Sequence, residues 1–165
     1  MAGLILFRHG KSDWDADSPG GDAARPLARR GRKAAKAMGK FLARAGQVPD
    51  AAITSPAVRA ADSLRLAMEA GGWTCATRTA DALYGGGVAG LLTEIRKEPD
   101  TTGVLLVAGH EPTWSEAVTA FIGGGRVRVP TAAVVRVNFD VERWKDVGMG
   151  TGELAWCVVP SLLTR

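Results

Sequence analysis

Cysteine and long hydrophobic runs are both scarce in this sequence. The chain has only Cys75 and Cys157, which stand far apart and form no CxxC pair. Neither a disulfide framework nor a zinc site is therefore indicated, and we expect both thiols to be buried. The apolar run at residues 4–7 is too short for a signal peptide, has no basic segment before it and leads directly into Arg8. No other segment approaches a membrane span, so we expect a soluble, cytoplasmic protein with no membrane partner.

Low-complexity tracts, internal repeats and known ion-binding loops are also lacking. With 165 residues, of which 46% are hydrophobic and 23% charged, the chain has the size and composition of one domain covering residues 1–165. The aspartates within residues 13–22 suggest a calcium loop, but Ser18 occupies the position that requires glycine. The Gly-Lys-Ser at residues 10–12 resembles the end of a nucleotide-binding P-loop, but Ile5 replaces its first glycine. We expect neither a metal ion nor a cofactor.

Histidine is rare as well, and both histidines stand in similar places. His9 follows the apolar run at residues 4–7, and His110 follows a second apolar run at residues 104–108. Such short, continuous apolar runs are typical of strands buried on both faces of a parallel sheet. Because ligands bind outside the carboxyl ends of such strands, we expect the two imidazoles to share one pocket. Two unrelated histidines that cap turns are the alternative.

The rest of the chain alternates between helical and strand patterns. Apolar residues at helical spacing predict helices, and short runs bounded by turn residues predict strands. The expected helices are 27–45, 55–72, 88–95 and 114–121, and the expected strands after the first are 51–54, 74–79, 104–108, 132–139 and 153–159. Residues 81–87 are expected to form a mobile loop. The alternation predicts an α/β fold with a mainly parallel central sheet.

Ser55 and Pro56 are typical of a helix start, since a capping hydroxyl precedes proline at the first helical position. This start places Arg59 in the first turn of the helix. A guanidinium beside free helix amides favours an anion site, although a plain surface arginine is the alternative.

Positive charge is concentrated in one stretch of the chain, although the net charge is only +4. The residues concerned are Arg25, Arg29, Arg30, Arg32, Lys33, Lys36, Lys40 and Arg44. Positions 29, 33, 36, 40 and 44 share one face of a helix. The simplest interpretation is a solvated face, and a docking surface for an acidic partner is the alternative. No aromatic stacking residues are interleaved with these charges, since Phe41 belongs to the apolar positions of the helix, so we expect no nucleic acid partner.

The carboxyl edge of the predicted sheet brings together Arg8, His9, Arg59 and His110, with Arg25 in the preceding loop. Arginine forks match phosphate oxygens in a bidentate way. Surrounding positive charge favours neutral histidine, which leaves a ring nitrogen free to attack phosphorus. Arginines can also neutralise the transferring group without a metal.

These residues stand in motifs that resemble the histidine phosphatase superfamily. The motifs are Leu-Phe-Arg-His-Gly-Lys-Ser at 6–12, Ser-Pro-Ala-Val-Arg-Ala at 55–60 and Gly-His-Glu-Pro at 109–112. The short length, Arg-Pro-Leu at 25–27 followed by Gly31, and Thr-Ala-Ala at 131–133 are similar to the SixA-type phosphohistidine phosphatases.

The resemblance implies a fold and a set of roles. The fold would be a phosphoglycerate mutase-like three-layer α/β/α sandwich. His9 would be the nucleophile that becomes phosphorylated, and His110 would stabilise the transition state. The residues that would hold the phosphoryl oxygens are Arg8, Arg25, Arg59 and Ser12.

A proton donor for the leaving group is the missing part of this set. Relatives that act on phosphomonoesters carry a glutamate between the second and third motifs, where Asp81 is the nearest match and Glu111 lies beside His110. An imidazole leaves as a neutral ring once protonated, so a weak or absent acid suits a phosphohistidine substrate, such as a phosphohistidine-containing protein. The alternatives are a small-molecule phosphomonoesterase that uses Asp81 as the acid and a binding module for phosphate or phosphohistidine without turnover. The oligomeric state is not indicated.

Overall fold

A computed structural model describes residues 1–163 and contains one six-stranded sheet. The strands are β1 (Ala2–Arg8), β2 (Ala51–Thr54), β3 (Ala76–Thr79), β4 (Val104–Gly109), β5 (Val134–Phe139) and β6 (Gly152–Val158). Their order across the sheet is β3-β2-β4-β1-β5-β6. All neighbouring pairs are parallel except those that β5 makes with β1 and β6. The mainly parallel sheet predicted from the sequence is confirmed.

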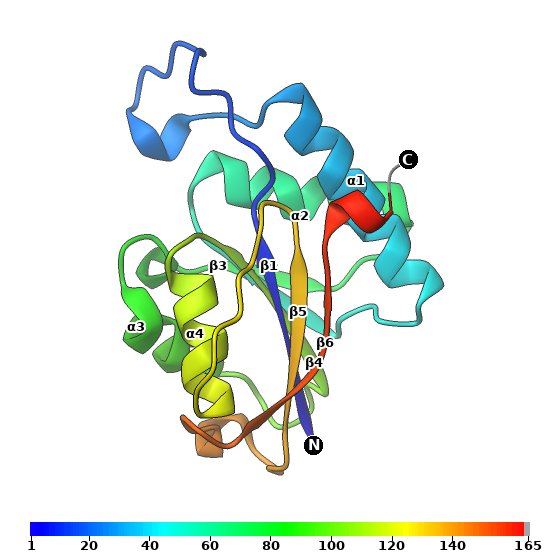
Figure 1. Cartoon of the computed structure of the whole chain (residues 1–165), viewed down its shortest axis with the longest axis vertical. Coiled ribbons are helices and arrows are strands. Elements are labelled where there is room, and N and C mark those ends of the chain that lie inside the picture. The colour runs from blue at the N-terminus through cyan, green and yellow to red at the C-terminus, as the bar shows by residue number, and fades with distance from the viewer. Residues whose placement is uncertain (164–165) are drawn as a thin grey trace.

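Four helices cover the two faces of the sheet (Figure 1). They are α1 (Arg29–Arg44), α2 (Val58–Gly71), α3 (Gly87–Ile95) and α4 (Thr113–Ile122). Helices α1 and α2 pack together on one face, and α3 and α4 pack on the other. The result is the predicted three-layer α/β/α sandwich. Among residues 1–163, no helix is long and apolar enough to span a membrane.

Strand β1 lies in the middle of the sheet and contributes to both cores. Leu4 and Leu6 belong to the core beneath α3 and α4, whereas Ile5 and Phe7 belong to the core beneath α1 and α2. All four side chains are fully buried. This alternation is why the run is continuously apolar, since a strand between two helical layers has no solvent-facing side.

Some local predictions were wrong. Helix α2 begins at Val58 with Ala57 as its N-cap, so Ser55 is not the cap and Pro56 is not its first residue. Arg59 still lies in the first turn. Strand β3 is shorter than predicted, because residues 74 and 75 precede its pairing with β2.

The segment after β3 and the two thiols also differ from expectation. Residues Asp81–Leu83 form a 3-10 turn where the glycine-rich sequence suggested only a loop, and Leu83 anchors this turn in the core. Cys75 is half-buried and Cys157 is exposed, because the edge strand β6 leaves that side chain uncovered.

Candidate active site

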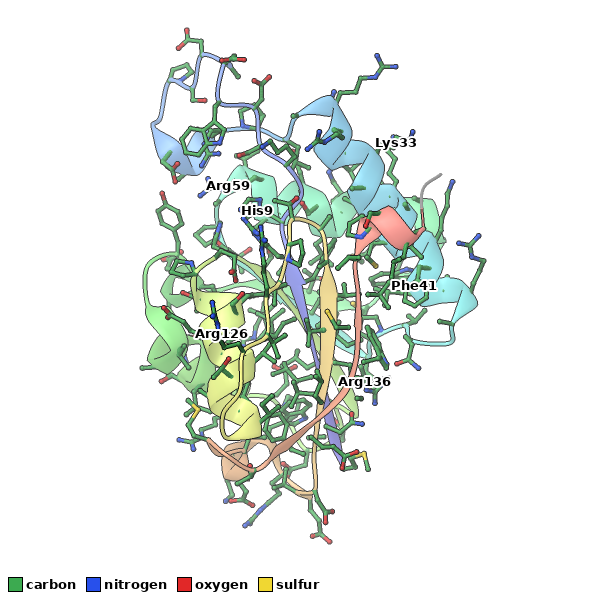
Figure 2. All side chains as sticks on the ribbon, viewed as in Figure 1. His9, Lys33, Phe41, Arg59, Arg126 and Arg136 are labelled. Carbon is green, nitrogen blue, oxygen red and sulfur yellow. The ribbon has the colours of Figure 1, made fainter. Side chains whose placement is uncertain are left out.

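The two histidines lie side by side at the carboxyl edge of the sheet. Strands β1 and β4 are adjacent and parallel, with Arg8 opposite Gly109, so the residues that follow them leave the sheet together. The centroids of the His9 and His110 rings are 5.2 Å apart. Figure 2 shows His9 at the end of β1 beside Arg59.

Both rings line a small cavity of about 330 Å³, called here the His9 pocket. Its lining residues are Arg8, His9, Lys11, Ser12, Trp14, Arg25, Arg59, His110, Glu111 and Thr131. The structure thus brings together all the predicted site residues except Asp81. Among residues 1–163, no three His, Cys, Asp or Glu side chains gather closely enough to hold a metal ion.

Hydrogen bonds fix the position and the tautomer of His9. Its backbone N–H donates to Gly109 at 3.0 Å, and its carbonyl accepts from the N–H of Ala132 at 2.9 Å. The ring Nδ1 lies 2.6 Å from the carbonyl oxygen of Gly10. Because a carbonyl only accepts, Nδ1 carries the proton and the lone pair resides on Nε2.

Burial keeps both imidazoles neutral. Burial first, and then the neighbouring His110, Arg59 and Arg8, lower the pKa of His9 to about 3, against the hydrogen bond to Gly10. Burial is also the main cause that lowers the pKa of His110 to about 4. At pH 7 the unprotonated Nε2 of His9 is therefore available as a nucleophile.

The turn after His9 is tied to the helix that carries Arg59. The N–H of Gly10 donates to Ser63 Oγ at 2.9 Å, and that hydroxyl donates to the Arg59 carbonyl at 2.6 Å. A Cβ on Gly10 would lie 2.6 Å from the Gly31 carbonyl oxygen, so only glycine allows this turn to contact the start of α1. Ser63 was not identified from the sequence, since a mid-helix serine gives no local signal.

His110 is held by the hydroxyl that the sequence suggested as a helix cap. His110 Nε2 and Ser55 Oγ are 2.7 Å apart, and the same oxygen accepts a 3.2 Å hydrogen bond from the N–H of Ala57. The Tyr84 ring packs edge-on against His110, with centroids 5.6 Å apart. Ser55 therefore orients an imidazole from the neighbouring strand.

Three guanidiniums face the same cavity from different elements. Arg8 ends β1 and donates to the Val129 carbonyl at 3.0 Å. Arg25 follows the long loop, donates to Ser12 Oγ and stacks over the Trp14 ring. In Arg8, Arg25 and Arg59 alike, the buried Nε has no hydrogen-bond partner among the described residues. Together they surround the cavity with donors suited to an oxyanion.

Asp22 connects two of these arginines and was not predicted as a site residue. Its carboxylate accepts from Arg25 at 2.8 Å and from Arg59 at 2.9 Å, and its carbonyl accepts from Arg59 at 2.8 Å. Tyr84 also donates to the carboxylate at 2.6 Å. The Tyr84 hydrogen bond and then the Arg25 hydrogen bond hold the pKa of Asp22 well below its usual range, so the group is ionised at pH 7.

The other two acidic groups near the site occupy different environments. Glu111 lines the His9 pocket, but its carboxylate accepts from the Ser115 N–H at 2.7 Å and the Ser115 hydroxyl at 2.5 Å, in the first turn of α4. Asp81 is exposed at the start of the 3-10 turn and is not among the lining residues. Tyr84, three residues later, is the part of that segment that reaches the site.

The sequence matches a known family over more than half of its length. Residues 4–102 match the histidine phosphatase superfamily (branch 1). This chain belongs to that superfamily. The uncharacterized protein Rv1276c of Mycobacterium tuberculosis is 35% identical over 168 residues, which cover 93% of this chain and 99% of that relative. Membership of the histidine phosphatase superfamily supports phosphatase activity.

Solved structures agree with this assignment. The protein histidine phosphatase SixA in complex with tungstate has a TM-score of 0.84 at 22% identity, covering 98% of this chain and 99% of that one. A structure from Nakamurella multipartitia, assigned as the phosphohistidine phosphatase SixA, has a TM-score of 0.79 at 26% identity, with 96% of each chain covered. The chain is thus SixA-like within the histidine phosphatase superfamily.

Proposed function

We propose that this protein is a metal-independent protein phosphohistidine phosphatase that works through a phosphorylated His9. The observation that carries the proposal is the state of His9, a buried neutral ring whose Nδ1 donates to Gly10 and whose Nε2 keeps its lone pair. The proposed reaction belongs to one domain covering residues 1–165.

The reaction has two displacements at phosphorus. In the first, His9 Nε2 attacks, the bond between phosphorus and the substrate nitrogen breaks, and a phospho-His9 intermediate forms. In the second, water attacks that intermediate, releasing inorganic phosphate and restoring neutral His9. Arg8, Arg25 and Arg59 would hold the phosphoryl oxygens, with Ser12 positioning Arg25, and His110 would stabilise the charge that develops in both transition states.

The leaving group favours phosphohistidine over a phosphomonoester. An alkoxide needs a proton from the enzyme, whereas an imidazole that has taken a proton from solvent on its other nitrogen departs as a neutral ring. The Glu111 carboxylate is engaged in hydrogen bonds with Ser115, which leave it poorly placed to protonate a leaving group. Asp22 is ionised between two arginines and has no proton to donate at pH 7. Asp81 lies outside the lining of the His9 pocket.

The decisive experiment compares substrates and traps the intermediate. We expect turnover of a phosphohistidine peptide to exceed turnover of alkyl phosphates, and rapid quenching to reveal acid-labile phosphate on His9. Both should be lost in His9→Ala and unaffected by dialysis against EDTA. Label on His110, faster turnover of alkyl phosphates, or tight binding of phosphohistidine without any hydrolysis would contradict the proposal.

A further inference from the structure

Helix α1 carries positive charge along its whole length and no carboxylate. Its sequence between Arg29 and Arg44 contains seven cations. They are Arg29, Arg30, Arg32, Lys33, Lys36, Lys40 and Arg44, all exposed. None forms an ion pair with a described residue, whereas arginines elsewhere in the chain do. Because the whole chain carries only +4, the rest of the molecule is net acidic.

This arrangement is unfavourable for an isolated helix. Arg29, Arg30 and Arg32 occupy the first turn, where the positive end of the helix dipole repels cations. Along the helix, cations three or four residues apart are neighbours of like charge. A helix face that is merely solvated usually carries both positive and negative side chains. The purely positive face of α1 therefore indicates a binding surface for a negatively charged partner.

The cations line a groove. A hollow of about 640 Å³ runs along α1, and we call it the α1 groove. Its lining residues are Arg29, Arg32, Lys33, Lys36, Ala37, Lys40, Arg44 and Leu163. At 1.5 Å per residue the groove extends about 22 Å along the helix, long enough for a folded or helical partner segment.

Shared lining residues link the α1 groove to the His9 pocket through a second hollow. This hollow of about 540 Å³ lies between them and shares Lys33 with the α1 groove. The same hollow shares Lys11 and Thr131 with the His9 pocket, and Arg30 adds another cation on the way. Figure 2 shows Lys33 on α1, on the same side of the molecule as His9.

Helix α1 is also fixed relative to the reacting histidine. A Cβ on Gly31 would lie 2.1 Å from the Lys11 carbonyl oxygen, so the first turn of α1 packs directly on the turn that follows His9. The Ala28 N–H donates to the same carbonyl at 2.8 Å. A molecule docked along α1 is therefore held at a constant distance from His9.

We propose that the α1 groove and the hollow beside Lys11 form a docking surface for an acidic face of the phosphorylated protein substrate. This inference rests on the proposed function and adds the partner chemistry. Carboxylates beside the phosphohistidine would pair with Lys33, Lys36 and Lys40 while the phosphorylated ring enters the His9 pocket. Specificity would come from this surface, because the small pocket accepts little more than the phosphorylated side chain.

An acidic protein fits this surface better than the other polyanions. Single-stranded nucleic acid binds to platforms of aromatic side chains, and no aromatic residue among those described lines either hollow. A membrane surface requires a row of apolar anchors beside the cations, and within residues 1–163 the α1 groove offers only Ala37 and Leu163.

The test uses two synthetic peptides of about 20 residues, long enough to span α1. Each carries one phosphohistidine, flanked by glutamates in the first peptide and by glutamines in the second. We expect the wild type to prefer the acidic peptide, through a lower KM, and this preference to shrink with added salt. Free phosphohistidine, which does not reach Lys36, serves as the reference for the chemistry in the His9 pocket.

Two variants with the same net charge separate docking from general attraction. Lys33→Gln/Lys36→Gln/Lys40→Gln should reduce the preference for the acidic peptide roughly tenfold, as the loss of three charge pairs implies. Arg126→Gln/Arg143→Gln/Lys145→Gln, with Arg126 on the α4 side in Figure 2, should change it by no more than about twofold. Equal losses in both variants, or no loss in either, would overturn the proposal.

A binding measurement keeps this inference separate from the proposed function. Anisotropy of a fluorescein-labelled acidic peptide without phosphate should report weaker binding to the α1 variant than to its control. Such a difference supports docking even if no phosphohistidine substrate is turned over, a result that would refute only the proposed function. Unlabelled acidic peptide, single-stranded oligothymidine and phosphatidylserine vesicles are then compared as competitors at equal concentrations of negative charge. If oligothymidine or the vesicles displace the labelled peptide more effectively than the unlabelled peptide does, the choice of an acidic protein is overturned.

Discussion

Tyr84 donates a 2.6 Å hydrogen bond to the Asp22 carboxylate, although 62 residues separate them in the sequence. The bond joins the loop after β1 to the segment after β3, directly beside the His9 pocket. The same carboxylate contacts Arg25 and Arg59, two of the groups proposed to hold phosphate. A phosphoryl group that binds to Arg25 and Arg59 therefore comes close to the negatively charged carboxylate of Asp22, which already contacts both arginines.

The first prediction concerns this negative charge. Asp22→Asn should tighten competitive inhibition by inorganic phosphate by roughly fivefold, since like charges about 4 Å apart in a water-like environment repel by about 1 kcal/mol. The amide oxygen still accepts hydrogen bonds from Arg59 and Tyr84, so the substitution removes charge with little change in shape. The measurement is the inhibition constant of phosphate at low ionic strength.

Tyr84→Phe is the control, because it removes a hydrogen bond to Asp22 and leaves the charge of the carboxylate in place. Its phosphate inhibition constant should stay close to that of the wild type. Weaker phosphate inhibition in Asp22→Asn would mean that the carboxylate mainly positions the arginines.

The second prediction concerns the geometry of Arg59. Two of its nitrogens contact Asp22, at 2.8 and 2.9 Å, so the guanidinium is already oriented for contact with two oxygens. We expect Arg59→Ala to reduce kcat/KM by roughly 10²- to 10³-fold, as for the loss of one oxyanion donor. Arg59→Lys should recover only part of this loss, because an ammonium is a point charge. Full recovery by lysine would show that charge alone matters.

The third prediction concerns the leaving group. Asp81→Asn should barely alter hydrolysis of a phosphohistidine peptide, because Asp81 is exposed and does not line the His9 pocket. Alkyl phosphates should be slow substrates for the wild type and the variant alike. A loss of ~10²- to 10⁴-fold on alkyl phosphates, with little change on activated aryl phosphates, would instead identify Asp81 as a general acid.

The fourth prediction concerns stability in mild acid. The pKa of His9 is about 3 in the folded protein and 6.5 in an unfolded chain. Between these values the unfolded chain binds a proton that the folded state does not, so stability falls as pH decreases below 6.5 and is unaffected above it. One such histidine accounts for roughly 2 kcal/mol between pH 6.5 and 5.

His9→Asn should therefore lose less stability than the wild type between pH 7.5 and pH 5. Urea denaturation at the two pH values measures the difference, and comparing each protein with itself removes any constant effect of the substitution. Equal losses in both proteins would mean that His9 is protonated in the folded state.

Local sequence signals were sufficient for the sheet and for much of the pocket. The apolar run at residues 4–7 predicted a strand buried on both faces, because apolar side chains on both sides of a strand leave no surface for water. His9 and His110 were paired correctly in space, since both follow parallel strands. Arg59 remained in the first turn even though the helix starts later than predicted.

Contacts between distant loops account for what sequence reasoning missed. The sequence places Asp22 only in a loop, because nothing near it in sequence reveals Arg59 or Tyr84 as its partners. Ser55 was assigned to a helix cap on local grounds, whereas the neighbouring strand supplies His110 as its partner. Such placements depend on closure of the whole fold, which has no local signature.

The central position of β1 has a consequence for biosynthesis. The strand leaves the ribosome well before its two neighbours, β4 and β5, which begin only at Val104 and Val134. Until then an apolar strand with both edges unpaired remains in the nascent chain, a condition that slows folding and favours binding by chaperones. A polypeptide that ends before Phe139 would therefore contain the complete His9 motif but lack part of the sheet that positions it.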